Sequence, residues 1–194
     1  MNNKDKLIQI ASRLFHLHGY EGTSIDMIMK ESGVCRSNFY YYFSSKEALA
    51  LATIRKTSLT FRDKMLTKTL LNRRLNPLER LDSFYEKAIS LQTSLFSEDL
   101  YAGCFFGNLA LEQSSNKNFR SALNHFFTEW HKAFQLCLEE GVGRGFFKED
   151  VDPENVAKLL ISQIEGAILL SKVTNSIDPL LSASTEMRKL IINA

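Results

Sequence analysis

A short polar and aromatic stretch near the N-terminus has side chains suited to binding a polyanion. Residues 35–42 read CRSNFYYY, and a helix over them would point Phe39 and Phe43 inward. Its other face would present Arg36 with hydroxyl and amide groups, which can donate to phosphates and to base edges in a major groove. The tyrosines and Lys46 suit phosphate contacts, which position a protein without reading sequence. An ordinary helical bundle explains the same residues equally well.

The surrounding residues predict how this helix is held. Residues 23–46 read TSIDMIMKESGVCRSNFYYYFSSK, in which a tight turn at 32–34 joins two short helices as in a helix-turn-helix. Gly33 suits the sharp turn, and Val34 would pack into the core. Thr23 is predicted to cap the first helix, with Asp26 reaching back in a variant capping box. Ser44 and Glu47 are predicted to form a capping box for the helix that follows.

The charge distribution is uneven along the 194 residues. Residues 1–74 hold 13 Lys and Arg against 6 Asp and Glu, whereas residues 75–194 hold 11 against 16. A basic first third indicates an anionic partner for that part of the chain. Much of the excess lies in residues 55–74, where a solvated helix face is an equally good explanation.

The apolar pattern predicts an all-α protein of about nine helices. Apolar residues recur at helical spacing through most of the chain, and no convincing alternating strand is present. Three small helices within residues 1–48 are followed by a fourth helix to about residue 71, and residues 49–194 form a larger helical body. Further helices are predicted at about 77–95, 104–113 and 117–140, and others begin at Asp152-Pro153 and Asp178-Pro179. Residues 141–145 are predicted to be a turn.

Other function classes find little support. The four histidines are spaced two or six apart in pairs, which does not place a pair on one helix face, so we expect no metal site, no cofactor and no catalytic residues. Three widely spaced cysteines make no disulfide framework, and no membrane span or secretory signal is visible. We therefore expect a cytoplasmic protein that does not bind membranes. The remaining alternatives are a helical thiol-based redox enzyme and a ligand-binding protein without DNA binding.

The stretch LIQIASRLFHLHGYEGTSIDMIMKESGVCRSNFYYYFSSKEAL resembles the N-terminal domain of TetR-family transcriptional repressors. The shared features are the LF…GY-x-GTS entry, the I-x-x-x-x-GV turn and the Y-x-YF-x-SKE-x-L exit, over about residues 7–50. The resemblance implies a homodimer that releases a palindromic DNA operator when a small molecule binds the C-terminal ligand-binding and dimerisation domain. Cys35 and Ser37 depart from the commoner serine and glycine, which leaves the base preference open. The candidate DNA-binding residues are Thr23, Cys35, Arg36, Ser37, Asn38, Tyr40, Tyr41, Tyr42 and Lys46.

The C-terminal part resembles one branch of that family. The segments YAGCFFGNLALEQS and GAILLSKVTNSIDPL are similar to a branch that includes the electrophile-responsive repressor of N-ethylmaleimide reductase. Cys104 is predicted near a helix N-terminus, where the helix dipole makes a thiol more reactive, and Lys172 is a candidate cationic neighbour. Cys104 is therefore a candidate oxidant or electrophile sensor. A buried structural cysteine is the alternative.

A non-covalent effector would need a pocket in the helical body. Its candidate liners are mostly aromatic, and each fits a packed core at least as well as a pocket. Gln163 and Glu165 could be pocket groups or hydrogen-bond partners at a dimer interface. The resemblance implies dimerisation through the last two helices, for which Val156, Leu159, Leu160, Gln163, Ile164, Ala167 and Ile168 offer an apolar face. The candidate liners are Phe61, Phe84, Tyr85, Cys104, Phe105, Phe106, Asn108, Trp130 and Phe134.

Overall fold

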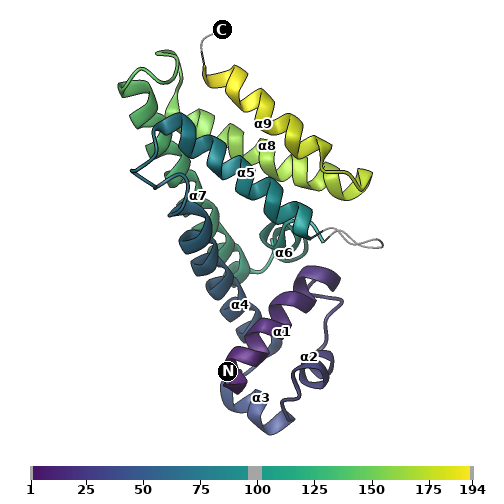
Figure 1. Ribbon diagram of the computed structural model, residues 1–194. Helices are drawn as coiled ribbons and strands as arrows, with labels where there is room; N and C mark the ends of the chain where they lie inside the picture. The colour runs from purple at the N-terminus through teal and green to yellow at the C-terminus, as the bar shows by residue number, and fades with distance from the viewer. Residues whose placement is uncertain (1, 96–101, 193–194) are drawn as a thin grey trace. The chain divides into compact units, whose positions relative to one another are not determined.

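The computed structural model describes residues 2–95 and 102–192, and these residues form nine α-helices and one π-helical segment without any strand (Figure 1). The predicted all-α fold is therefore confirmed. Tyr101 of the YAGC motif lies outside the described residues. The elements are α1 (Asn3–His18), α2 (Ile25–Ser32), α3 (Arg36–Tyr42), α4 (Lys46–Phe61), η1 (Arg62–Leu66), α5 (Pro77–Ser94), α6 (Phe105–Gln113), α7 (Lys117–Gly143), α8 (Pro153–Thr174) and α9 (Asp178–Ile191).

The chain forms two compact units, and α4 and α7 each continue from one into the other. The first unit contains residues 1–59 and 104–126, and the second contains residues 60–103 and 127–194. The first unit thus joins α6 and the start of α7 to the N-terminal helices. We predicted a boundary after residue 48 between a DNA-binding domain and an effector-binding and dimerisation domain. That boundary separates two functions, and it stays a prediction.

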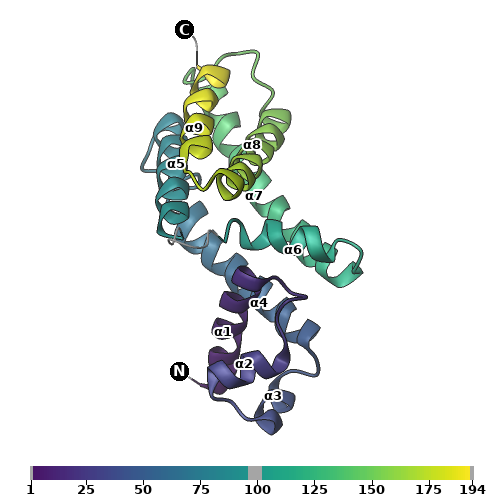
Figure 2. The same cartoon turned by 90° about the vertical axis from the view of Figure 1, so that its right-hand side faces the viewer.

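The N-terminal helices pack around a small apolar core. Leu7 and Phe15 of α1, Ile28 of α2, Phe39 of α3 and Leu49 of α4 are all inaccessible to water. In α1 the buried side chains recur every three or four residues, so they form one stripe that faces the neighbouring helices. Figure 2 shows α1, α2 and α3 gathered beside the start of α4. Full burial of each such side chain contributes about 1.5–3 kcal/mol to folding.

Two predicted helix caps are wrong by one residue. Ser24, and not Thr23, caps α2, because its side chain accepts from the Met27 amide at 3.1 Å. At the start of α4, Ser45 and not Ser44 accepts from the Ala48 amide at 3.0 Å. In both cases two adjacent hydroxyl residues compete, and the sequence pattern does not distinguish between them.

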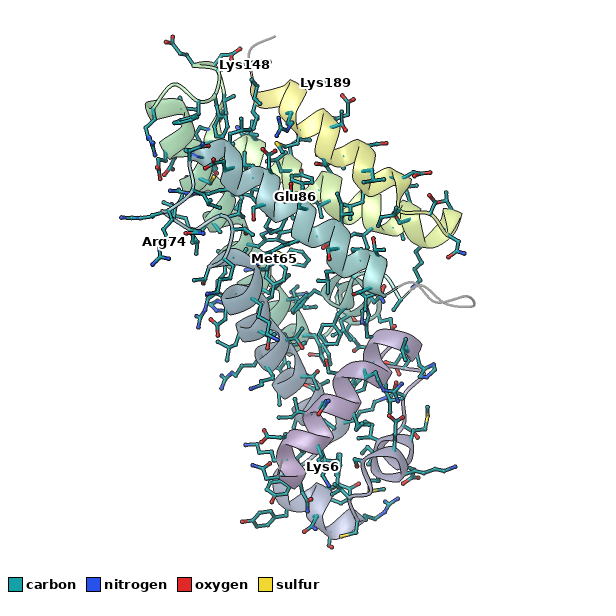
Figure 3. The ribbon with its side chains drawn as sticks, viewed as in Figure 1. Lys6, Met65, Arg74, Glu86, Lys148 and Lys189 are labelled. Atoms are coloured by element: carbon teal, nitrogen blue, oxygen red, sulfur yellow. The ribbon has the colours of Figure 1, made fainter. Side chains whose placement is uncertain are left out.

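The fourth helix is shorter than predicted. α4 ends at Phe61 and gives way to a π-helical turn, in which the Thr67 amide donates to the Arg62 carbonyl at 2.9 Å. The chain then runs through turns to the start of α5, and Arg74 projects from these turns (Figure 3). The buried Arg80 guanidinium holds this connection by donating from Nε to the carbonyls of Asn72 and Leu75, both at 2.9 Å.

In the second unit α5, α8 and α9 lie side by side (Figures 1 and 2). The predicted start of α5 is confirmed, since Asn76 and Glu79 form a complete capping box around Pro77. Asp152 likewise caps α8 through the amides of Glu154 and Asn155. α9 begins at Asp178 as predicted, although it has no side-chain cap. Lys148 Nζ donates to the Lys189 carbonyl at 3.1 Å at the end of α9 (Figure 3).

α7 is longer than predicted. It continues through residues 141–143, which we had assigned to a turn, and the chain changes direction only at Gly145, where φ is +71°. Gly141 is enclosed by the Phe147 ring, which would lie 2.0 Å from a Cβ atom at this position. A glycine inside the helix here serves close packing and does not end the helix.

Candidate nucleic-acid interface

The turn between α2 and α3 has the geometry that the sequence predicts. Gly33 adopts the left-handed conformation with φ +66° and ψ +18°, and Val34 is buried directly after it. Nothing lies within 4 Å of a Cβ atom built on Gly33, so glycine is required by the backbone and not by space. Cys35 then takes the cap position of α3 in an extended conformation.

The polar face of α3 is exposed to water. Tyr41 is 79% exposed and Tyr40 is 48% exposed, while Phe39 and Phe43 are buried. Phe39 and Phe43 thus point inward, and the polar side chains of α3 face the solvent, as the sequence predicts. The remaining exposed residues of this face are Cys35, Arg36, Ser37 and Asn38, and Tyr42 is half-buried.

Two contacts order the first turn of α3. Arg36 Nη2 forms an ion pair with Asp26 Oδ1 of α2 at 2.6 Å. The Cys35 sulfur lies 3.2 Å from the Ser37 hydroxyl, and this hydrogen bond lowers the pKa of the exposed Cys35 thiol. The helix therefore presents an arginine, a thiol and hydroxyls at one end.

Two of the candidate contacts have partners within the protein. Thr23 is fully buried and its hydroxyl donates to the Gly19 carbonyl at 2.8 Å, so its side chain is not available to DNA. Lys46 Nζ donates to the carbonyls of Tyr20 and Thr23 at 3.0 and 3.1 Å, and it lies 4.1 Å from the centre of the Tyr20 ring. These contacts close the loop between α1 and α2. Thr23 and Lys46 therefore contribute to the folding of the N-terminal bundle, and a DNA contact by Lys46 stays a prediction.

Sequence reasoning missed a set of contacts between α6 and the N-terminal bundle. Glu112 Oε2 accepts from the Glu21 amide at 3.0 Å, and Gln113 Nε2 donates to Glu21 Oε1 at 2.6 Å. Asn118 Nδ2 at the start of α7 donates to Glu47 Oε1 at 2.8 Å. These partners lie 71 to 92 residues apart in sequence, and no local spacing could have identified them.

Cys104 lies at the start of α6. Its half-buried sulfur caps this helix by accepting from the Gly107 amide at 3.4 Å. A helix N-terminus favours the negative thiolate. Phe105 packs edge-on against His16, and Asn108 Nδ2 donates to the His16 carbonyl at 3.5 Å. Lys172 is exposed in the last turn of α8, in the other unit.

The other pocket candidates form an aromatic cluster within the second unit. Phe84 lies 4.9 Å from Phe134 and 5.8 Å from Trp130, and Phe61 lies 5.5 Å from Trp130, all between ring centres. Tyr85 donates from its hydroxyl to Gln163 Oε1 at 3.3 Å, and burial raises the pKa of Tyr85. Packing against one another accounts for the burial of these rings. Phe106 instead stacks on Phe126 at 3.5 Å in the first unit.

α8 has two apolar faces, and four of the seven residues of the predicted dimer face lie on the inner one. Leu160, Ile164, Ala167 and Ile168 are buried within the protein's own second unit. The outer face is a stripe with the small residues Ser162 and Gly166 between larger apolar side chains. Leu159, Leu169, Leu170 and Val173 are all more than half exposed in this stripe, and Leu181 and Leu190 of α9 are also exposed.

The turn, the buried Phe39 and the exposed polar face of α3 define a helix-turn-helix DNA-binding protein. Residues 7–53 match the family described as bacterial regulatory proteins of the tetR family. Residues 77–187 match the family described as the tetracyclin repressor-like C-terminal domain. The chain belongs to the TetR family of transcriptional regulators.

Relatives that match most of this chain are named as transcriptional regulators. An HTH-type transcriptional regulator in the lacX 3' region of Lactococcus lactis is 32% identical over 180 residues, which are 92% of this chain and 88% of the relative. The HTH-type transcriptional repressor DhaR of Mycobacterium sp. strain GP1 is 28% identical over 91% of this chain and 86% of its own. The crystal structure of the reduced form of E. coli NemR matches with a TM-score of 0.90 at 23% identity, over 100% of this chain and 99% of that one. This structural match supports the fold.

Two other kinds of feature are absent from the described part of the chain. No helix among residues 2–95 and 102–192 is long and apolar enough to cross a membrane. The same residues contain no group of three histidine, cysteine or acidic side chains that could hold a metal ion.

Proposed function

We propose that this regulator is a repressor that holds its operator through α3 and leaves it when an effector acts on the helical body. The observation that carries the proposal is the exposed polar face of α3 above a buried Phe39. The name of DhaR, a repressor, supports the direction of regulation. Asn38, Tyr40 and Tyr41 are exposed candidate contacts on this face, and Arg36 is exposed at the start of the helix.

Binding of the purified protein to the DNA upstream of its own gene, over a salt series, tests this assignment. Neutralised phosphates make the logarithm of the binding constant fall linearly with the logarithm of salt concentration. Replacing Tyr41 by Ala, which removes an exposed side chain without touching the core, should weaken binding at least tenfold. Salt-independent binding, or no binding by the wild-type protein, would refute the proposal.

We propose further that the active form is a dimer built through the outer stripe of α8 and the exposed leucines of α9. Small residues at 162 and 166 would let two copies of α8 approach closely, and the leucines and Val173 would bury apolar surface at the rim. A two-fold dimer presents two α3 helices to successive major grooves, about 34 Å apart, which suits a palindromic operator.

Cys104 is the proposed electrophile sensor. In the proposed step its thiolate adds to the carbon–carbon double bond of a maleimide or quinone, so that a C–S bond forms and the neighbouring carbanion takes a proton from water. The helix N-terminus favours the thiolate that this addition needs. A non-covalent effector bound among the aromatic residues of the second unit is the alternative mode of release.

The bonds of α6 support a route from this thiol to α3. Cys104 begins the helix, and Glu112 and Gln113 at its other end hold Glu21, in the loop that Lys46 closes. Alkylation of the capping sulfur would weaken its bond to the Gly107 amide and disturb the start of α6. Displacement of α6 would then loosen the loop beside α2.

The three cysteines allow a controlled test with N-ethylmaleimide. Burial raises the pKa of Cys137 to about 12, so this thiol should not react in the folded protein. Cys35 is exposed on the DNA-facing helix, where a bulky adduct would block binding directly. We expect C35S to release DNA on treatment as the wild type does, and the double variant C35S/C104S to stay bound. Release that persists in C35S/C104S, or is already lost in C35S, would refute the sensor.

A further inference from the structure

Asp26 places a negative charge on the surface that is proposed to face DNA. Its Oδ1 accepts from Arg36 Nη2 at 2.6 Å, across the turn that joins α2 to α3. The side chains are 73% and 62% exposed, and an ion pair in that setting contributes little to folding stability. A carboxylate here repels the phosphate backbone, so its position calls for another explanation.

The pair changes what Arg36 can bind. A lone arginine at the first position of α3 would be attracted to any phosphate within reach, whatever the base sequence. Paired with Asp26, the two side chains are together neutral, which removes most of that attraction. Only one of the five N–H groups of the guanidinium is used by Asp26, so the others remain available for acceptors on base edges.

The combination of charges resembles the complement of a G·C pair. In the major groove guanine offers two acceptors, O6 and N7, and cytosine offers the N4 amino donor beside them. Arg36 supplies donors for guanine, and the adjacent carboxylate supplies an acceptor for cytosine. An A·T pair does not offer this arrangement, because adenine presents both an acceptor and a donor and thymine presents an acceptor.

We propose that Asp26 is a specificity-determining residue, which holds Arg36 away from the phosphates and recognises a G·C pair together with it. The inference rests on the proposed assignment of α3 as the reading helix. It adds a residue of α2 that no motif in the sequence had marked as a DNA contact.

The test is selection of preferred sites from a randomised DNA duplex library by the full-length protein, followed by titration of the selected and a random duplex. The variants are D26N, which keeps the shape and removes the charge, and R36M. The matched control is E31Q, since Glu31 also lies on α2 and pairs with Arg13, away from α3. Circular dichroism confirms that each variant is folded.

We expect wild type and E31Q to select the same site with a G·C pair at one position of each half. D26N should lose about tenfold of its preference at that position and bind the random duplex several-fold more tightly. Its dependence on salt should be steeper by about one phosphate contact, as Arg36 becomes free to bind phosphate. R36M should lose the same base preference without the gain in affinity for random DNA.

Four results would overturn the inference. D26N could retain the wild-type preference, or it could lose affinity for all sequences equally, which indicates a structural role for Asp26. E31Q could change binding as D26N does, in which case net charge explains the effect. If the wild type selects no sequence at all, the proposed function fails and this inference fails with it.

Discussion

The exposed side of α3, in the DNA-facing part, differs in polarity from the exposed side of α8, in the helical body. In α3 the exposed side is polar, and the structure keeps only Phe39 and Phe43 inside. In α8 both sides are apolar, and the exposed side carries leucines with a glycine between them. The polar surface is suited to a hydrated polyanion, whereas the apolar surface is stable only when another surface covers it. The comparison teaches that the two proposed binding surfaces differ in the chemical character of their exposed side, which is polar in α3 and apolar in α8.

The largest effects are expected from two matched core substitutions, one in each unit. Phe39→Ala and Phe134→Ala each remove a fully buried ring, so each should lower the free energy of unfolding by about 3–5 kcal/mol in urea titrations. Phe39→Ala should abolish DNA binding and leave the dimer intact in sedimentation. Phe134→Ala should weaken the dimer. If both variants lose the same activity, the assignment of DNA binding to the first unit and of dimerisation to the second is wrong.

The ion pair in the second unit should produce the next largest effect. Arg80 is buried and its Nη1 donates to Glu140 Oε2 at 2.7 Å, so Glu140→Gln leaves a buried charge without its counter-ion. Because Glu140 is partly exposed, we expect a loss of about 2 kcal/mol, below the range for a fully buried pair. DNA affinity measured at a temperature where the variant is folded should not change.

The same pair should give an acid-dependent stability. Hydrogen bonds from Arg80 and Arg144 lower the pKa of Glu140 below its ordinary value of 4.5. The carboxylate therefore stabilises the fold fully above that ordinary value, and this contribution is lost as the pH falls through the lower folded pKa. The difference in unfolding free energy between wild type and E140Q should shrink below about pH 4.5. A difference that stays constant would contradict the role of the charge.

A smaller effect is expected at Thr23, and it distinguishes a role of this residue in folding from a role in DNA contact. Thr23→Val removes the hydroxyl that donates to the Gly19 carbonyl but fills the same space. We expect a loss of about 1 kcal/mol in unfolding free energy and no more than a twofold change in DNA affinity once the protein is folded. A tenfold loss of affinity without loss of stability would return Thr23 to the DNA contacts.

The smallest change in stability is expected at Gly166 on the outer face of α8. No atom of the described residues outside this turn of α8 lies within 4 Å of a Cβ atom there, so Gly166→Ala should stabilise the single subunit by about 0.5–1 kcal/mol. If two copies of α8 meet at this glycine, the same methyl group should weaken the dimer in sedimentation. Gly143→Ala, at the end of α7 and equally open, is the control and should leave the dimer unchanged. An unchanged dimer in Gly166→Ala would refute the proposed interface.

The elements that sequence predicted well are those with local causes. The capping box at Asn76 and Glu79, the left-handed Gly33 and the inward Phe39 each depend on neighbours within a few residues. Where two hydroxyl residues are adjacent, as at Thr23 and Ser24, local rules identified the cap region but not the residue. The fold and most of the exposed face of α3 were therefore predictable.

The misses come from contacts between distant segments. The bonds of Glu112 and Gln113 to Glu21 depend on how α6 packs, which no spacing in the sequence encodes. In α8 the apolar residues nearly surround the helix, so periodicity could not decide which side faces the protein's own core. The pairing of Asp26 with Arg36 also required coordinates, because it joins two helices across a turn.

The π-helical turn after α4 has a consequence for how the length of this chain can vary. Bonds from Thr67 to Arg62 and from Leu71 to Leu66 each close on the fifth residue, so residues 62–66 contain one residue more than an α-helical turn requires. Deleting one residue there would let ordinary α-helical winding continue from the end of α4 through this turn. Deleting one from the middle of α4 would rotate everything beyond it by about 100° and bring charged groups into the core. We therefore expect a single-residue deletion to be tolerated better in this turn than in the middle of α4.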